Sequence, residues 1–133
     1  MRQTSTRWTA LIVAAALAGP VTGCVAAAAA GAAGAIYATS RGSEALVNGS
    51  VEDITARARA VMADMGIAPE AEESHSAGDK HELKGKQGDL DVTIAMERSD
   101  SATTKVEVFA RKNLAEWDKD YSRAVLERIV KKG

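Results

Sequence analysis

The only cysteine of the sequence is the side chain whose chemistry is easiest to interpret. Cys24 follows Val21, Thr22 and Gly23, and it precedes a stretch made almost entirely of alanine and glycine. A thiol is a nucleophile that can carry a covalent modification. One cysteine forms no disulfide within the chain and no multi-cysteine zinc site. The sequence before Cys24 therefore has to indicate what the thiol is for.

The residues before Cys24 have the pattern of a secretory signal. Arg2 and Arg7 lie in a start without acidic residues, an apolar run follows at residues 9–19, and Pro20 then interrupts any helix. A positive start and a short apolar run direct export and are removed afterwards. Residues 21–24 resemble a bacterial lipobox. The resemblance implies a lipoprotein signal peptide at residues 1–23 and transfer of a diacylglyceryl group to the Cys24 thiol. It also implies cleavage between Gly23 and Cys24, where small residues leave room for the peptidase. Cys24 would then be the first residue of the mature chain and would carry acyl chains such as palmitate.

Two other interpretations of this segment stay open. An ordinary secretory signal could be cut at one of the alanines, which would leave Cys24 a bystander. Residues 9–38 also carry no charge and are long enough for a transmembrane helix. Two features argue against a transmembrane helix. Pro20 would interrupt it, and the alanine and glycine side chains of its second half gain little from burial in hydrocarbon.

Composition divides the rest of the chain into two parts. Residues 24–42 are an Ala/Gly-rich tether whose side chains bury too little area to form a core. Residues 43–133 have the mixed composition of a small α+β domain. Lysine and arginine number 17 and aspartate and glutamate 18, so the chain lacks the basic excess that binds nucleic acid by counterion release.

Periodic patterns predict the elements of the domain. A helix begins after Ser50, its apolar residues recur every three or four positions, and Gly66 ends it. A second amphipathic helix is predicted over residues 114–132, with Trp117 and Tyr121 in the core. Alternating apolar and polar residues predict strands at residues 44–48, 68–76, 80–86, 90–97 and 104–111.

These elements predict an α+β fold, an antiparallel sheet of about four or five strands with two helices packed on one face. The order is strand, helix, strands, helix. The other face of the sheet is then exposed to solvent and carries charged side chains of both signs. Phe109 is the one aromatic residue among them, and together with Lys105 and Arg111 it forms a candidate partner-binding surface. A bulge that turns Phe109 inward is the open alternative.

Other chemistry finds little support in the sequence. His75 and His81 lie near Glu73 and Asp79, but two histidines beside a hairpin are more often surface residues than metal ligands. The chain lacks the Gly-x-Ser-x-Gly, phosphate-loop and dinucleotide-binding patterns. No catalytic residue, metal or cofactor is therefore predicted.

From Gly23 onward the chain resembles a family of small bacterial lipoproteins with an Ala/Gly-rich linker and a domain of unknown function. The matching features are the Gly23-Cys24 pair, the linker into Ile36-Tyr37, "MGI" at 65–67, "DVTIAM" at 91–96 and a terminal helix with Ser122, Arg123 and Ile129. The sequence "RKNLAEWDKD" at 111–120 differs from the glycine-containing link that this family has before its last helix. The resemblance implies an envelope location and an α+β domain, without an activity.

The sequence thus predicts a lipid-anchored lipoprotein of the bacterial cell envelope. Val25 rather than aspartate after Cys24 favours the periplasmic face of the outer membrane. The domain would be a structural or interaction module for an envelope protein or a peptidoglycan-associated partner. The alternatives are a small-ligand or lipid-binding domain, which needs a cleft between helices and sheet, and an enzyme without a recognised motif.

Overall fold

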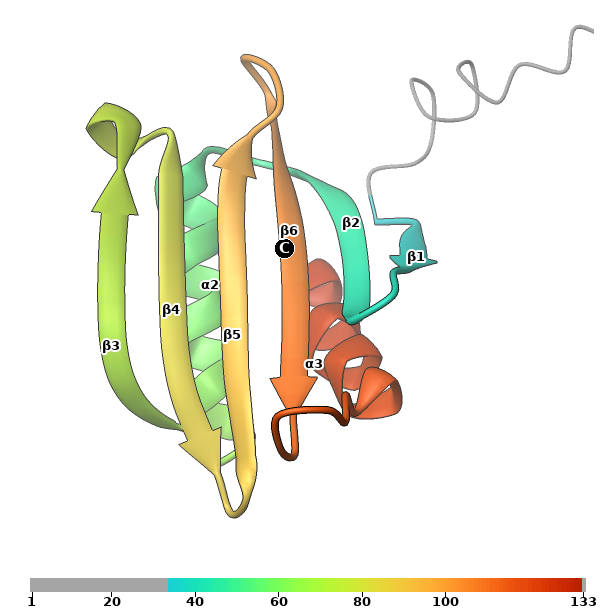
Figure 1. Cartoon of the computed structure of the whole chain (residues 1–133). Coiled ribbons are helices and arrows are strands. Elements are labelled where there is room, and N and C mark those ends of the chain that lie inside the picture. The colour runs from blue at the N-terminus through green and yellow to red at the C-terminus, as the bar shows by residue number, and fades with distance from the viewer. Residues whose placement is uncertain (1–33, 133) are drawn as a thin grey trace, which may run out of the picture.

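The structure is a computed structural model that describes residues 34–132. It contains one six-stranded antiparallel sheet with the strand order β1-β2-β6-β5-β4-β3, and two helices, α2 and α3 (Figure 1). The elements in chain order are β1 (Ile36–Ala38), β2 (Gly42–Asn48), α2 (Val51–Asp64), β3 (Ala68–His75), the 3₁₀ turn η1 (Ser76–Gly78), β4 (Lys80–Gln87), β5 (Leu90–Arg98), β6 (Thr103–Arg111) and α3 (Lys119–Lys131). The predicted α+β class with an antiparallel sheet and two helices is confirmed.

The strand count differs from the prediction of four or five, because the sheet has six strands and two of them precede α2. The additional strand is β1, which lies within the range expected to be tether and pairs with β2 from Ile36↔Ala45 to Ala38↔Ser43. In the turn between the two strands, the Gly42 amide donates to the Thr39 hydroxyl at 2.9 Å. A strand of three residues is too short for alternation to be visible in a sequence.

The two ends of α2 follow directly from its sequence. The Ser50 hydroxyl accepts a hydrogen bond from the Asp53 amide at 3.1 Å, and this satisfies one of the free amides at the helix start. At the other end Gly66 adopts a φ of +69°, and the Ile67 amide donates to the Met62 carbonyl at 2.8 Å. This pattern closes the helix and turns Ile67 back into the core.

Helix α3 begins later than predicted, at Lys119 instead of residue 114. The side chain of Asn113 accepts hydrogen bonds from the amides of Ala115 and Glu116, both at 3.0 Å, which holds these residues in a turn. Asp118 then caps the helix by accepting from the Tyr121 amide at 2.9 Å. Short polar side chains that bond to nearby amides compete with helix formation in this way.

Both helices pack on the same face of the sheet, as predicted (Figure 1). Helix α2 covers β4 and β5, and α3 covers β2 and β6. The largest side chains of this core that are fully buried include Ile54, Ile94, Met96, Leu126 and Ile129. No helix in the described range combines the length and the hydrophobicity needed to span a bilayer. The face of the sheet turned away from the helices is called the open face below.

Candidate functional site

The three residues of the candidate partner-binding surface lie on the open face of β6. Thr104, Val106, Val108 and Ala110 alternate with them and are at most 1% exposed on the helix side. Phe109 is paired with Gly42 of β2 and Thr93 of β5, so the strand keeps its regular register at this point. Phe109 is therefore not turned inward by a bulge.

Phe109 forms a cluster with residues from two neighbouring segments. The Trp117 ring meets the Phe109 ring edge to face, with centroids 6.2 Å apart and an interplanar angle of 67°. The Arg41 guanidinium lies 5.0 Å from the Phe109 centroid and 5.8 Å from that of Trp117, and the Arg111 guanidinium lies 5.9 Å from Trp117. These are distances at which a cation is attracted to an aromatic face. The four residues are called the open-face cluster.

The prediction that Trp117 belongs to the core is wrong. The residue precedes α3 and forms a bridge to Arg111 at the end of β6, which brings its ring to the open face. The Asp118 amide donates to the Ala110 carbonyl at 2.7 Å and holds the segment there. Tyr121 is the other aromatic residue that was predicted to lie in the core. It is partly buried and packs against the core.

Lys105 and Arg111 have different surroundings, although both lie on β6. The Lys105 ammonium lies 3.0 Å from the Glu107 carboxylate and 3.9 Å from that of Glu97, and the Glu107 hydrogen bond raises the pKa of Lys105. Arg111 lies 4.0 Å from the Asp91 carboxylate and also faces Trp117. The structure therefore places Phe109 and Arg111 in one cluster, and it places Lys105 in a separate row of alternating charges.

A second surface feature lies on the helix side, between α2 and the β3–β4 edge of the sheet. A cavity of about 440 Å³ is lined there mainly by apolar side chains, among them Met62, Ile67, Pro69 and Leu83. The register of β3 shifts between Pro69 and Ala71, and every residue of β3 is exposed. The strand thus leaves α2 incompletely covered.

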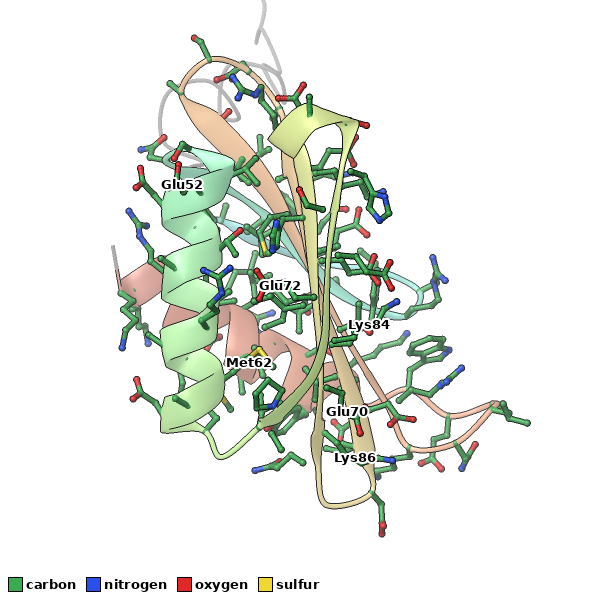
Figure 2. The ribbon with its side chains drawn as sticks, turned by 90° about the vertical axis from the view of Figure 1, so that its left-hand side faces the viewer. Glu52, Met62, Glu70, Glu72, Lys84 and Lys86 are labelled. Atoms are coloured by element: carbon green, nitrogen blue, oxygen red, sulfur yellow. The ribbon has the colours of Figure 1, made fainter. Side chains whose placement is uncertain are left out.

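A cluster of hydrogen-bonded, ionisable side chains joins α2 to β3 and β4 in this region. Arg59 of α2 donates to Glu72 of β3 through both Nε, at 3.2 Å, and Nη2. The His81 Nε2 atom of β4 lies 2.6 Å from the same carboxylate. The hydrogen bonds from Arg59, and then that from His81, hold the pKa of Glu72 below its usual value. Figure 2 shows Glu72 and Met62 on the α2 side of the sheet and Lys84 on the other side.

A smaller and more polar cavity of about 330 Å³ lies further along α2, toward its amino-terminal end. Its lining includes Ser50, Thr55, His81 and Arg98, and Arg59 lines both this cavity and the apolar one. We call the two cavities together the α2–β3 trough, with an apolar half and a polar half that meet at Arg59. The sequence did not indicate it, because the trough depends on three elements and on the bulge in β3. One signal was present, since Glu72 and His81 share the helix-facing side of adjacent strands.

The two histidines considered as metal ligands do not converge. His75 lies 3.4 Å from Glu73, whereas His81 pairs with Glu72. Asp79 pairs instead with Arg98, at 2.8 Å. Within residues 34–132, no three or more histidine, cysteine, aspartate or glutamate side chains are grouped as a metal site would require.

The predicted lipidation site, Cys24, and the predicted cleavage site between Gly23 and Cys24 lie outside the described range. The part that the structure describes is an α+β domain whose two helices cover one face of a six-stranded antiparallel sheet, with the open-face cluster on one side and the α2–β3 trough on the other. Compared with known proteins, the chain matches no family model, no curated protein sequence and no solved structure.

Proposed function

We propose that this protein is a lipid-anchored lipoprotein of the bacterial cell envelope, on the periplasmic face of the outer membrane, and that its domain is an interaction module. The proposed anchor is supported by the order of features in the sequence: a basic start, a short apolar run, and Val21, Thr22 and Gly23 before Cys24. Burial of acyl chains contributes about 0.8 kcal/mol per methylene group, so two or three chains on Cys24 hold a protein stably in a bilayer.

The open-face cluster is the observation that carries the proposed interaction. Two aromatic rings and two guanidinium groups, those of Phe109, Trp117, Arg41 and Arg111, gather on a face that otherwise carries rows of paired charges. Aromatic and arginine side chains supply most of the binding energy in many protein interfaces. The partner proposed is an envelope protein that places an apolar side chain against the rings and carboxylates against the two arginines.

Intact-protein mass spectrometry of the membrane fraction tests the anchor. The expected species begins at Cys24 and carries the mass of the acyl chains, and the Cys24→Ser variant should lose this species and appear uncleaved or in another fraction. A soluble chain with a free thiol and a first residue other than Cys24 would contradict the anchor.

Crosslinking in cells, followed by affinity recovery, tests the interaction. The Trp117→Ala variant should recover at least tenfold less of the partner than the unaltered protein. Tyr37→Ala is a matched control, because Tyr37 is an aromatic residue that is 52% exposed on β1 and lies outside the cluster. Equal recovery by both variants, or no specific partner with the unaltered protein, counts against the interaction module.

The cavity between α2 and the β3–β4 edge favours a second candidate function, a small-ligand or lipid-binding domain. Its volume of about 440 Å³ falls within the range of about 300–1,000 Å³ that is common for small-molecule sites. The lining is mainly apolar, as such sites usually are.

A further inference from the structure

We propose that the α2–β3 trough binds a single-chain amphiphile with an anionic head. The alkyl chain would occupy the apolar half, and the head would lie at Arg59, where the two halves meet. The inference rests on the second candidate function and names its ligand class. It does not depend on the lipid anchor or on the open-face cluster.

The apolar half supplies the site for the chain. Its floor consists of Met62, Ile67 and Leu83, which are only 2–4% exposed and belong to the hydrophobic core. A volume of about 440 Å³ is roughly fifteen times the ~30 Å³ of a water molecule in the liquid, and a methylene group is of similar size. Because the cavity is open to solvent on one side, a chain of about 10–12 carbons fits it better than two chains do.

Close packing at the floor explains why the cavity is not deeper. Gly85 of β4 lies beneath α2, and a Cβ atom added to it would come within 2.6 Å of the Met62 methyl group and 2.8 Å of Ile67 Cγ2. The chain therefore lies along the outside of this contact, between Met62 and the bulged part of β3.

The polar half supplies hydrogen-bond donors for the head. Arg59, Arg98 and His81 line it, together with Glu52. Arg98 is paired with Asp79 and Arg59 with Glu72, so the head would be held by the Arg59 N–H groups that Glu72 leaves free. An anionic head offers these donors acceptors, and a quaternary ammonium head offers none. Carboxylate, phosphate and sulfate share the acceptor geometry that a guanidinium recognises.

Arg59 has free donors for such a head although it is already paired. A guanidinium carries five N–H groups. The hydrogen bonds to Glu72 use Nε–H and one N–H of Nη2, so three N–H groups remain for a second acceptor. Arg59 lines both halves of the trough. An acceptor bound to these donors therefore lies at the place where a chain leaves the apolar half.

The binding experiment uses the chain from residue 24 onward with Cys24→Ser. This protein retains every described residue, and it lacks attached acyl chains that would compete for the trough. Isothermal titration with octanoate, decanoate and dodecanoate, below their micelle concentrations, should give one site whose affinity rises about tenfold for every two methylene groups. Dodecyl phosphate should bind comparably to dodecanoate, dodecanol about tenfold more weakly, and dodecyltrimethylammonium more weakly still.

Matched variants locate the site. Ala63→Phe places a ring at the wall of the apolar half and should abolish binding, whereas Ala56→Phe, at another exposed position of α2, should leave it unchanged. Arg59→Gln should weaken dodecanoate about tenfold and dodecanol less than twofold, because it removes a charged donor and no apolar wall. Glu72→Gln should strengthen dodecanoate binding, because it removes a competing carboxylate. Thermal unfolding of each variant verifies its folding.

Four results would overturn the proposal. They are no saturable binding of any chain length, equal binding by the Ala63→Phe and Ala56→Phe variants when both are folded, equal affinity for dodecanoate and dodecanol, and no effect of Arg59→Gln on dodecanoate. None of these results depends on the mass of the membrane-bound form, which is the measurement that tests the proposed anchor. Failure of this proposal is therefore distinguishable from failure of the proposed anchor.

Discussion

Replacement of Gly85 by alanine tests how closely α2 lies over β4. The added Cβ would be 2.6 Å from Met62 Cε, 2.7 Å from the Ala68 carbonyl oxygen and 2.8 Å from Ile67 Cγ2. The Met62 methyl group is the end of a flexible side chain and can move. The Ala68 oxygen belongs to the backbone of β3, where Ala68 is paired with Lys86, so it can move only with the edge of the sheet.

Overpacking of this kind costs typically about 1–3 kcal/mol. For a domain of this size, 1 kcal/mol lowers the melting temperature by about 4–8 °C. A cost of about 2 kcal/mol therefore predicts a melting temperature about 8–16 °C below that of the unaltered protein. Urea denaturation and thermal unfolding followed by circular dichroism measure both quantities.

Gly88→Ala is the matched control, because it separates steric crowding from backbone conformation. A Cβ at Gly88 would meet no atom within 4 Å, but the residue has a φ of +57°. Its cost is therefore conformational, about 1 kcal/mol. In a double-mutant cycle of Gly85→Ala and Met62→Ala, the coupling energy should equal only the part of the steric cost that arises from the methionine. If Gly85→Ala were as stable as the unaltered protein, α2 could not lie at the observed distance from β4, and the floor of the trough would be wrongly placed.

Three further predictions concern single contacts. A double-mutant cycle of Trp117→Ala and Phe109→Ala, measured by urea denaturation, should give a coupling energy of about 0.5–1.5 kcal/mol, and a value near zero would mean that the rings do not touch in solution. The Tyr121 hydroxyl is buried without a hydrogen-bond partner in the described part of the chain. Tyr121→Phe should therefore leave the free energy of unfolding unchanged or raise it by up to about 1 kcal/mol, and a clear loss would reveal a partner. Hydrogen bonding, chiefly from Arg59, lowers the pKa of Glu72 from its ordinary 4.5, so the stability that this group contributes is present above pH 4.5 and is lost as the pH falls through the lowered value. Thermal melts between about pH 7 and pH 3 should show a smaller loss for Glu72→Gln, and equal losses would contradict this assignment.

The faces of the sheet were predictable because a strand has a period of two. In β5, Val92, Ile94 and Met96 are at most 1% exposed and alternate with Thr93 and Ala95, which are partly exposed. The same alternation in β6 placed Phe109 on the open face. Periodicity thus determined which side chains face the helices, although it gave no information on which other segments reach the open face.

The residues that surround Phe109 could not be predicted, because periodicity does not show which other segments reach the open face. The spacing of Trp117 and Tyr121 continues the apolar stripe of α3 backward, so the pattern by itself favours one longer helix. The side chains of Asn113 and Asp118 end that pattern by bonding to backbone amides. This competition depends on local geometry that a count of apolar spacings does not include.

The α2–β3 trough was unpredictable for a different reason. Residues 68–75 contain few apolar side chains, and the sequence therefore indicated only a weak, acidic strand. The cavity results from the register shift between Pro69 and Ala71 and from the pairing of Glu72 with Arg59, contacts that join separate elements. Only the three-dimensional arrangement brings them together.

The position of β6 in the sheet has a consequence for the order of folding. Strands β3 to β6 are joined by short connections and pair with their neighbours in the chain, whereas β2 pairs with β6 across more than half of the described sequence. Closing so long a loop costs entropy that local hairpins avoid. We therefore expect the β3–β6 meander to form first and to act as the template on which β2 docks. During synthesis or export, β2 can pair with β1, but its other edge would lack a partner until β6 has emerged.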